Sequence, residues 1–183
     1  MIAHFCWTEP GGHDENQDSA AVQAVEGDAL AFLCAIADGQ GGQTGAALAS
    51  AIACKSCLET TSSYRLNQLL SPSNWPDILS ESDRAVAAAE GAGYTTLAAF
   101  CLTENALCGS SSGDSAVLLL NANQSPLILT SNQEKNPPVG SGGATFVPFA
   151  ARLIYPWTVL AMTDGVWKYV GWESVIAIAS NAS

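Results

Sequence analysis

Two apolar stretches of the chain each end in an Asp-Gly pair. Residues 30–37 lead into Asp38-Gly39, and residues 159–163 lead into Asp164-Gly165. A short apolar stretch can be a buried strand. The Asp then lies where the strand leaves the core, beside a Gly whose backbone can approach a ligand closely. Hard divalent cations bind carboxylate and carbonyl oxygens, although an Asp-Gly pair taken alone is more often a simple turn.

The pattern recurs twice more, which favours a site over a set of turns. Asp114-Ser115 directly precedes the apolar residues 116–120, and Asp18 precedes a further apolar stretch. The four acids stand at the ends of predicted strands, so their carboxylates meet if those strands share one edge of a sheet. Gathered like charges repel, and a bound cation relieves the repulsion. We therefore expect a hydrolytic site with one or two metal ions.

The motifs around these acids resemble a known family. Their order and approximate spacing, from the first residues through Lys168, are similar to those of the metal-dependent protein phosphatases, the PPM or PP2C-type serine/threonine phosphatases. The motifs are Asn16-Gln17-Asp18, Ala37-Asp38-Gly39-Gln40-Gly41-Gly42, Gly93-Tyr94-Thr95-Thr96, Gly113-Asp114-Ser115 and Thr163-Asp164-Gly165. Each motif is weak alone, but five in the right order are specific.

The resemblance implies a fold and an activity. The fold would be α+β, a four-layer α-β-β-α sandwich of two antiparallel sheets flanked by helices, with the metal site at one end between the sheets. The activity would be hydrolysis of phosphoserine or phosphothreonine in proteins, with one to three Mn²⁺ or Mg²⁺ ions. A phosphoprotein would be the substrate, and a cognate serine/threonine kinase is a possible partner.

The resemblance also assigns roles to single residues. Asp38 would bridge two metal ions, and Gly39 would give its carbonyl oxygen to one of them. Asp164 would bind the second ion, Asp18 would act through metal-bound water, and Asp114 with Asp164 would hold a third ion. A metal-bridging water would attack phosphorus in line, because the cations lower its pKa and neutralise the phosphate oxygens.

Three features depart from the family pattern. His13 stands where the family has a phosphate-binding Arg, and a His can donate to phosphate but carries charge only when protonated. The stretch between Asp114 and Asp164 leaves little room for a flap over the site. No Asp follows Asp164 in the sequence, so the second ion is weakly held or absent, Glu173 or another group substitutes, or the acid lies beyond the given sequence.

These departures keep other functions open. One alternative is a catalytically impaired relative that binds a phosphoprotein or a kinase in a regulatory role. A weaker one is a sugar- or nucleotide-phosphate hydrolase that uses the same site. As an alternative to a role in phosphate binding, His13, like His4, is an ordinary surface residue.

Composition sets the remaining bounds. The chain has 183 residues, 48% of them hydrophobic, and we expect a single domain over residues 1–183. The formal net charge is -11, with six Lys plus Arg against seventeen acids, so nucleic acid and anionic membranes are not expected partners. The sequence has neither an apolar run of bilayer length nor a signal-peptide pattern, so we expect a cytoplasmic protein with reduced cysteines.

Local patterns predict the order of the elements. We expect a first edge strand at residues 1–8, a hairpin of residues 19–25 and 30–37 with its turn at 26–28, and helices at 44–59, about 74–91 and 172–179. Short strands are expected at residues 95–103, 106–110, 115–120 and 125–130, with a last pair at 152–155 and 157–163. Residues 131–150 are predicted to form a loop, and Thr44 to cap the first helix.

Overall fold

The strands of the computed structural model form two antiparallel sheets, and the model describes residues 2–12, 14–25, 31–40 and 44–181. The five-stranded sheet has the order β1 (Asp18–Ala24), β2 (Phe32–Asp38), β3 (Leu97–Leu102), β4 (Ala106–Ser112), β7 (Val147–Arg152). The three-stranded sheet has the order β6 (Leu127–Ile128), β5 (Ala116–Asn121), β8 (Trp157–Met162).

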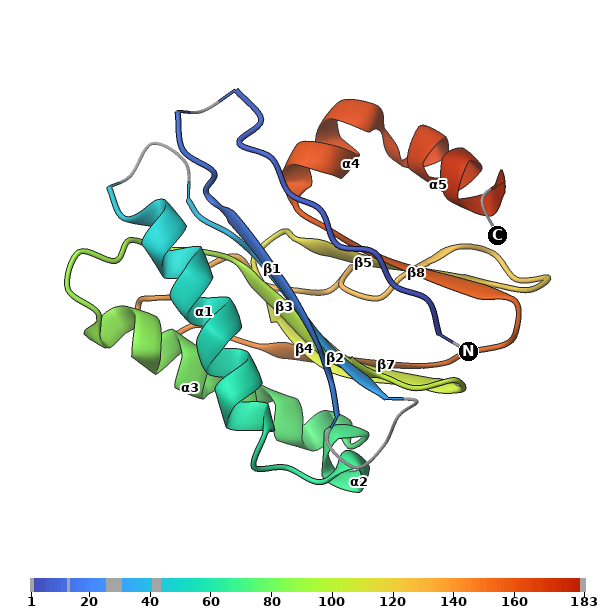
Figure 1. Cartoon of the computed structure of the whole chain (residues 1–183), viewed down its shortest axis with the longest axis horizontal. Helices are drawn as coiled ribbons and strands as arrows, with labels where there is room; N and C mark the ends of the chain where they lie inside the picture. Colours follow the sequence, from blue (N-terminus) through green and yellow to red (C-terminus); the bar gives the residue numbers. More distant parts are fainter. Residues whose placement is uncertain (1, 13, 26–30, 41–43, 182–183) are drawn as a thin grey trace.

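Helices cover the outer face of each sheet (Figure 1). The five-stranded sheet carries α1 (Ala46–Thr61) and α3 (Trp75–Ala88), which are joined through α2 (Leu66–Leu69) and the 3-10 helix η1 (Pro72–Asn74). The three-stranded sheet carries α4 (Asp164–Val170) and α5 (Trp172–Asn181). The result is the predicted α-β-β-α sandwich, and the predicted α+β class is confirmed.

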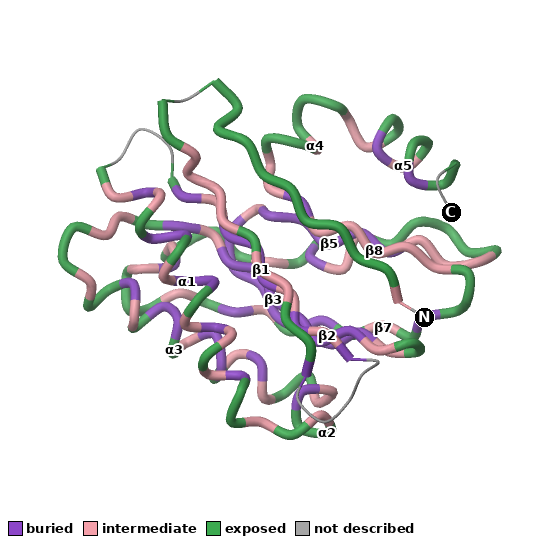
Figure 2. The backbone as a smooth tube through the Cα atoms, in the orientation of Figure 1, coloured by how far each residue is buried: buried purple, intermediate pink, exposed green. Residues whose placement is uncertain are grey.

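The side-chain alternation of β3 shows how the sandwich is filled. Leu97, Ala99 and Cys101 face the cluster under α1 and α3. Ala98, Phe100 and Leu102 face the cluster between the two sheets. Successive side chains of a strand point to opposite faces, and here both faces are covered, so all six residues of β3 are buried. Figure 2 shows the same contrast, with a buried central sheet and an exposed N-terminal segment beside β1.

Small side chains let α1 lie close to the sheet. The buried residues of this helix recur at intervals of three and four positions, as expected for one helix face. They are Ala46, Ala49, Ser50, Ala53, Cys54, Cys57 and Thr61. The close contact of α1 with β1 and β2 brings the start of the helix next to the end of β2, where Asp38 lies.

Several predicted elements need correction. Residues 2–10 form no strand, and their side chains are largely exposed, so they bury no strand face. The first helix begins after Gly45 without a side-chain cap, so Thr44 does not cap it. β7 starts inside the predicted loop 131–150 and pairs with β4, and β8 pairs with β5, so the predicted last strand pair is wrong.

The remaining predicted elements lie close to their expected positions, and α4 was not predicted. The hairpin turn predicted at residues 26–28 lies outside the described residues. The six cysteines, all of which lie within the described residues, form no disulfide. Within the described ranges, no helix combines the length and apolar character needed to cross a bilayer.

Trp75 gives a direct test of the core beneath the helices. Its side chain is fully buried, and its indole Nε1 donates a hydrogen bond of 2.8 Å to the carbonyl oxygen of Leu69. Trp75→Phe is expected to lower the free energy of unfolding by about 2 kcal/mol, because it leaves a cavity and an unpaired buried carbonyl. Urea denaturation in EDTA measures this, with the exposed Trp7→Phe as control. Equal losses in both variants would contradict the packing described.

Candidate functional site

The register of the first sheet places two acids side by side. β1 begins at Asp18 where β2 ends at Asp38, and the two residues are direct antiparallel partners. Their carboxylates therefore belong to one end of the five-stranded sheet. Like charges directly opposite each other on neighbouring strands repel, so this pairing costs stability unless something compensates it.

The register of the second sheet places the other two acids in the same way. Ala116 of β5 pairs with Met162 of β8. Asp114 precedes that pair by two residues and Asp164 follows it by two, so both lie at the same end of the three-stranded sheet. Asp164 is in the first turn of α4.

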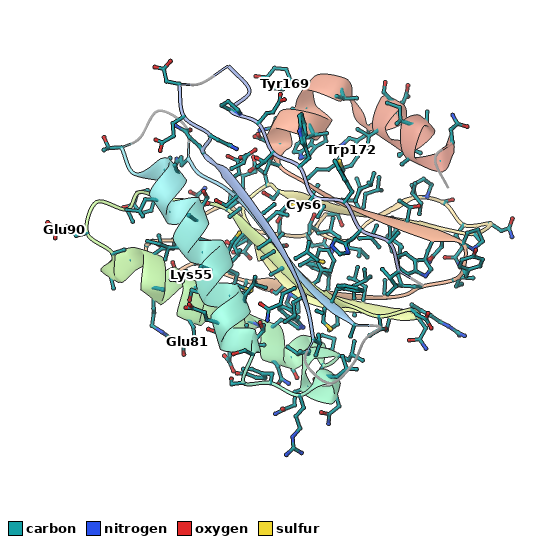
Figure 3. All side chains as sticks on the ribbon, viewed as in Figure 1. Cys6, Lys55, Glu81, Glu90, Tyr169 and Trp172 are labelled. Atoms are coloured by element: carbon teal, nitrogen blue, oxygen red, sulfur yellow. The ribbon has the colours of Figure 1, made fainter. Side chains whose placement is uncertain are left out.

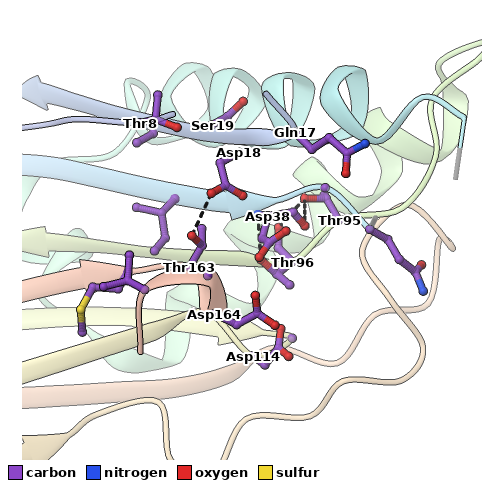
Figure 4. A pocket seen from close by; sticks show the side chains of 18 of the residues that line it. Thr8, Gln17, Asp18, Ser19, Asp38, Thr95, Thr96, Asp114, Thr163 and Asp164 are labelled. Carbon is purple, nitrogen blue, oxygen red and sulfur yellow. Dashed lines mark hydrogen bonds between the residues drawn. The ribbon is translucent and has the colours of Figure 1, made fainter. Parts of the chain in front are cut away.

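The two acid pairs meet in one cavity between the sheets. It has a volume of about 970 Å³, and all four Asp residues line it; Figure 4 shows their side chains turned toward this space. Two side-chain hydrogen bonds hold the sheets together here. The Thr163 hydroxyl donates to Asp18 Oδ2 at 2.8 Å, and the hydroxyls of Thr96 and Ser115 lie 2.7 Å apart.

Neighbouring threonines fix the backbone of Asp38. Its N–H donates to Thr96 Oγ1 at 2.9 Å, and its carbonyl oxygen accepts from Thr95 Oγ1 at 2.9 Å and from the Thr96 N–H at 2.9 Å. The Thr-Thr motif of the sequence therefore positions Asp38. The hydroxyl of Thr163 makes no cap for α4; it bonds Asp18.

Gly39 lies where no larger residue fits. A Cβ atom at this position would come within 2.4 Å of the Ala46 carbonyl oxygen and 2.8 Å of the Gln17 carbonyl oxygen. The start of α1 and the residue before β1 thus both press against the turn that follows Asp38. By contrast, Gly165 has open space where a Cβ would point.

The two acid pairs differ in their electrostatic surroundings, because lysines contact the second pair. Burial, together with repulsion from the other three carboxylates and a hydrogen bond with Asp164, raises the pKa of Asp38 to about 7 from an ordinary 3.8. Burial alone would raise the pKa of Asp114 as well, but hydrogen bonds from Lys135 and Lys168 hold it below its usual value.

Two lysines therefore belong to the site, and the sequence analysis missed both. Lys135 Nζ lies 2.7 Å from Asp114 Oδ2, Lys168 Nζ lies 3.2 Å from the same oxygen, and Lys168 also donates to Asp164 Oδ2. The bonds to Asp164 and Asp114 raise the pKa of Lys168. The sequence did contain a signal for Lys168, because it follows Asp164 by four residues. In a helix such as α4, residues four apart lie one turn apart and can form an ion pair. No pattern in the sequence indicated Lys135.

The donor set suits a hard divalent cation, since it consists of carboxylate oxygens beside the Gly39 backbone. Burial and the three neighbouring carboxylates both raise the pKa of Asp38, so a cation near this carboxylate would be favourable. In the described part of the chain, no group of three or more His, Cys, Asp or Glu side chains is gathered closely enough to enclose an ion. An ion held by all the predicted ligands would thus require side-chain rearrangement, above all at Asp164 and Asp114.

Other predicted site residues lie elsewhere. His13 is outside the described residues, so its role in phosphate binding stays a prediction. His4 is exposed, and its ring centroid lies 5.2 Å from that of Phe32, away from the cavity lining. Glu173 is an exposed residue in the first turn of α5 and does not line the cavity.

Comparisons with known proteins agree on the fold. No protein-family model and no curated protein sequence matches the chain. Among solved structures, a point variant of a bacterial serine phosphatase matches with a TM-score of 0.79 and 20% identity, over 94% of this chain and 81% of the other. Serine/threonine phosphatase Stp1 from Staphylococcus aureus matches with a TM-score of 0.72 and 19% identity, over 92% and 78%.

A third similar structure contains metal. The catalytic domain of the serine/threonine protein phosphatase PstP, in complex with two manganese ions, matches with a TM-score of 0.69 and 21% identity, over 90% of this chain and 78% of that one. The four-layer sandwich with an acid-lined cavity at one end thus defines a class of fold. That fold is the one of the bacterial PP2C-type serine/threonine phosphatases, as the sequence motifs predicted.

The two Asp-Gly pairs allow a matched test of the packing at Gly39. Gly39→Ala is expected to lower the free energy of unfolding by about 2 kcal/mol or more, because backbone atoms on two sides must shift. Gly165→Ala is expected to change it by less than about 1 kcal/mol and to be stabilising, since it adds a helix-favouring residue in open space. Urea denaturation without metal compares them. Equal effects would contradict the different surroundings of the two glycines.

The raised pKa of Asp38 predicts a pH dependence of stability in the metal-free protein. Between about pH 4 and pH 7 the folded protein holds a proton that the unfolded chain has lost, so the free energy of unfolding falls as pH rises. Asp38→Asn removes this loss. The free energy of unfolding of Asp38→Asn is expected to exceed that of the wild type by almost nothing at pH 4 and by about 1–2 kcal/mol at pH 8. This value is reduced for solvent screening.

Denaturation curves recorded in EDTA from pH 4 to pH 8 measure this difference. A difference in free energy of unfolding between the wild type and Asp38→Asn that stays constant over this pH range would contradict the raised pKa of Asp38.

Proposed function

We propose that the protein is a divalent-metal-dependent phosphatase that removes phosphate from phosphoserine or phosphothreonine in proteins. The observation that carries the proposal is the meeting of two in-register acid pairs, Asp18 with Asp38 and Asp114 with Asp164, in one cavity. The serine/threonine phosphatase fold of the chain supports the same reaction class.

Mn²⁺ or Mg²⁺ is the proposed cofactor. Asp18, Asp38 and the Gly39 carbonyl would hold one ion at the end of the first sheet, and Asp164 would contribute from the second sheet. When bound there, such a cation would lower the pKa of a water for attack on phosphorus and would neutralise phosphate oxygens. The chain carries a net charge of -11, so a phosphorylated substrate would otherwise be repelled.

Several residues of the chain would prepare this reaction. The Thr163 hydroxyl orients the Asp18 carboxylate, and the Thr95 and Thr96 hydroxyls hold the backbone of Asp38. Lys135 lines the cavity with its side chain 59% exposed, so its ammonium group can also attract a phosphoryl group. These contacts reduce the freedom of the acids before substrate arrives, which lowers the cost of reaching reactive geometry.

Two exposed aromatic side chains of the cavity lining could contact a protein substrate. Trp7 and Tyr169 line the cavity while remaining 64% and 88% exposed. Exposed aromatic side chains beside a polar centre suit contact with an extended peptide, because they offer apolar area at low entropic cost.

A regulatory binding protein without turnover is the second candidate. The hydrogen bonds of Lys168 to Asp114 and Asp164 favour it, since they engage both acids of the second sheet. Such a protein would bind a phosphothreonine peptide and release no phosphate from it.

The proposal predicts metal-dependent hydrolysis. With Mn²⁺ titrated from zero, the wild type is expected to hydrolyse an aryl phosphate and a phosphothreonine peptide. Asp38→Asn is expected to lower kcat/KM by at least about a hundredfold, because it removes a charged metal ligand. Asp14→Asn, at an exposed acid that does not line the cavity, is the control. Phosphate release measures both.

A lack of hydrolysis would contradict the proposal. Folded wild-type protein that releases no phosphate from either substrate at any Mn²⁺ concentration would reject the enzyme. Peptide binding retained under those conditions would support the regulatory protein.

A further inference from the structure

Lys168 lies between the two acids of the second sheet. Its ammonium group donates to Asp114 Oδ2 at 3.2 Å and also to Asp164 Oδ2. Lys168 and Asp164 are separated by one turn of α4, so the helix itself keeps the positive charge beside Asp164. Asp114, which lies two residues before β5, is brought to the same ammonium group by the pairing of β5 with β8.

Aromatic contacts hold the Lys168 side chain in this position. The neighbouring Trp167 donates its indole Nε1 to the Asp114 carbonyl oxygen at 3.3 Å and stacks on Trp172, with ring centroids 5.4 Å apart. Lys168 Nζ lies 5.4 Å from the centroid of the Trp167 ring, within the range of a cation–π contact. The backbone of Asp114 and the helix carrying Lys168 are thus joined by a second bond besides the ion pair.

The scarcity of positive charge in the chain makes this arrangement informative. The sequence has six Lys plus Arg, and two of them, Lys135 and Lys168, contact Asp114. The side chain of Asp114 is only 19% exposed, and partly buried ion pairs are screened less than surface ones. Positive charge from the protein itself is therefore concentrated on the second-sheet pair.

We propose that the ammonium group of Lys168 replaces a further divalent ion between Asp114 and Asp164. It neutralises the two carboxylates that would otherwise bind that ion. Metal binding then depends on the Asp18–Asp38 pair, and Asp114 is a partner of lysine and not a metal ligand. The inference rests on the proposed function, because it takes a divalent cation at the first-sheet pair as given.

Mn²⁺ binding tests this inference without substrate. Isothermal titration calorimetry, with the electron paramagnetic resonance signal of free Mn²⁺ as a second readout, gives the number of bound ions. Lys168→Gln, which keeps much of the side-chain length but removes the charge, is expected to bind one more Mn²⁺ ion than the wild type. Lys168→Arg keeps the charge and is expected to match the wild type.

Lys55→Gln is the matched control. Lys55 also forms an ion pair four residues along a helix, with Glu59 at 3.7 Å, but it is an exposed residue of α1 (Figure 3) and does not line the cavity. This variant is expected to bind Mn²⁺ as the wild type does. Asp114→Asn is expected to leave the number of ions bound by the wild type unchanged, but to remove the additional ion from Lys168→Gln.

Two results would overturn the inference. One is an equal, non-zero number of bound ions in the wild type, Lys168→Gln and Lys55→Gln; no binding in any of them would reject the metal-dependent function together with this inference. The other is loss of an ion from the wild type on Asp114→Asn. Circular dichroism confirms that each variant is folded. In every other case the proposed function is tested separately, by phosphate release and not by the number of ions.

Discussion

Repulsion among the Asp18, Asp38, Asp114 and Asp164 carboxylates is the constraint on which the organisation of this protein depends. Strand register makes each pair unavoidable, and the packing of two sheets brings the pairs into one cavity. A fold that serves stability alone has no reason to collect acids in this way, because gathered like charges in a half-buried place repel one another. Burial, and after it the repulsion from the other three carboxylates, raises the pKa of Asp38. A bound cation would relieve the repulsion and turn the same charges into a site.

The rest of the sandwich keeps the acids from moving apart. The cluster between the sheets, with Phe100, Val117 and Phe149 among its members, fixes their separation. The Thr163–Asp18 and Thr96–Ser115 contacts then fasten the two sheets at the end where the acids lie. Because interiors are close-packed and resist deformation, the carboxylates are held near one another although they come from four separate points of the chain.

The sequence revealed the acids but not all that surrounds them. Lone acids at strand ends could be seen as a pattern, and the alternating burial of β3 follows the expected period of two. β7 was missed because Pro148 suggests a loop, although Pro is tolerated on an edge strand such as this one. α4 was missed because it has seven residues and contains Gly165, and Lys168 was missed with it. Lys135 reaches Asp114 through the tertiary structure, and no local sequence pattern indicates a contact of this kind.

The proposal on which this interpretation depends is that a divalent cation binds at the end of the sandwich, in the cavity that the four carboxylates line. Anomalous diffraction at the manganese edge, from crystals grown with Mn²⁺, tests it most directly. We expect an anomalous peak within coordinating distance of the Asp38 carboxylate and the Gly39 carbonyl oxygen, beside Asp18. Manganese bound elsewhere on the surface, with the cavity free of anomalous signal at saturating Mn²⁺, would contradict it.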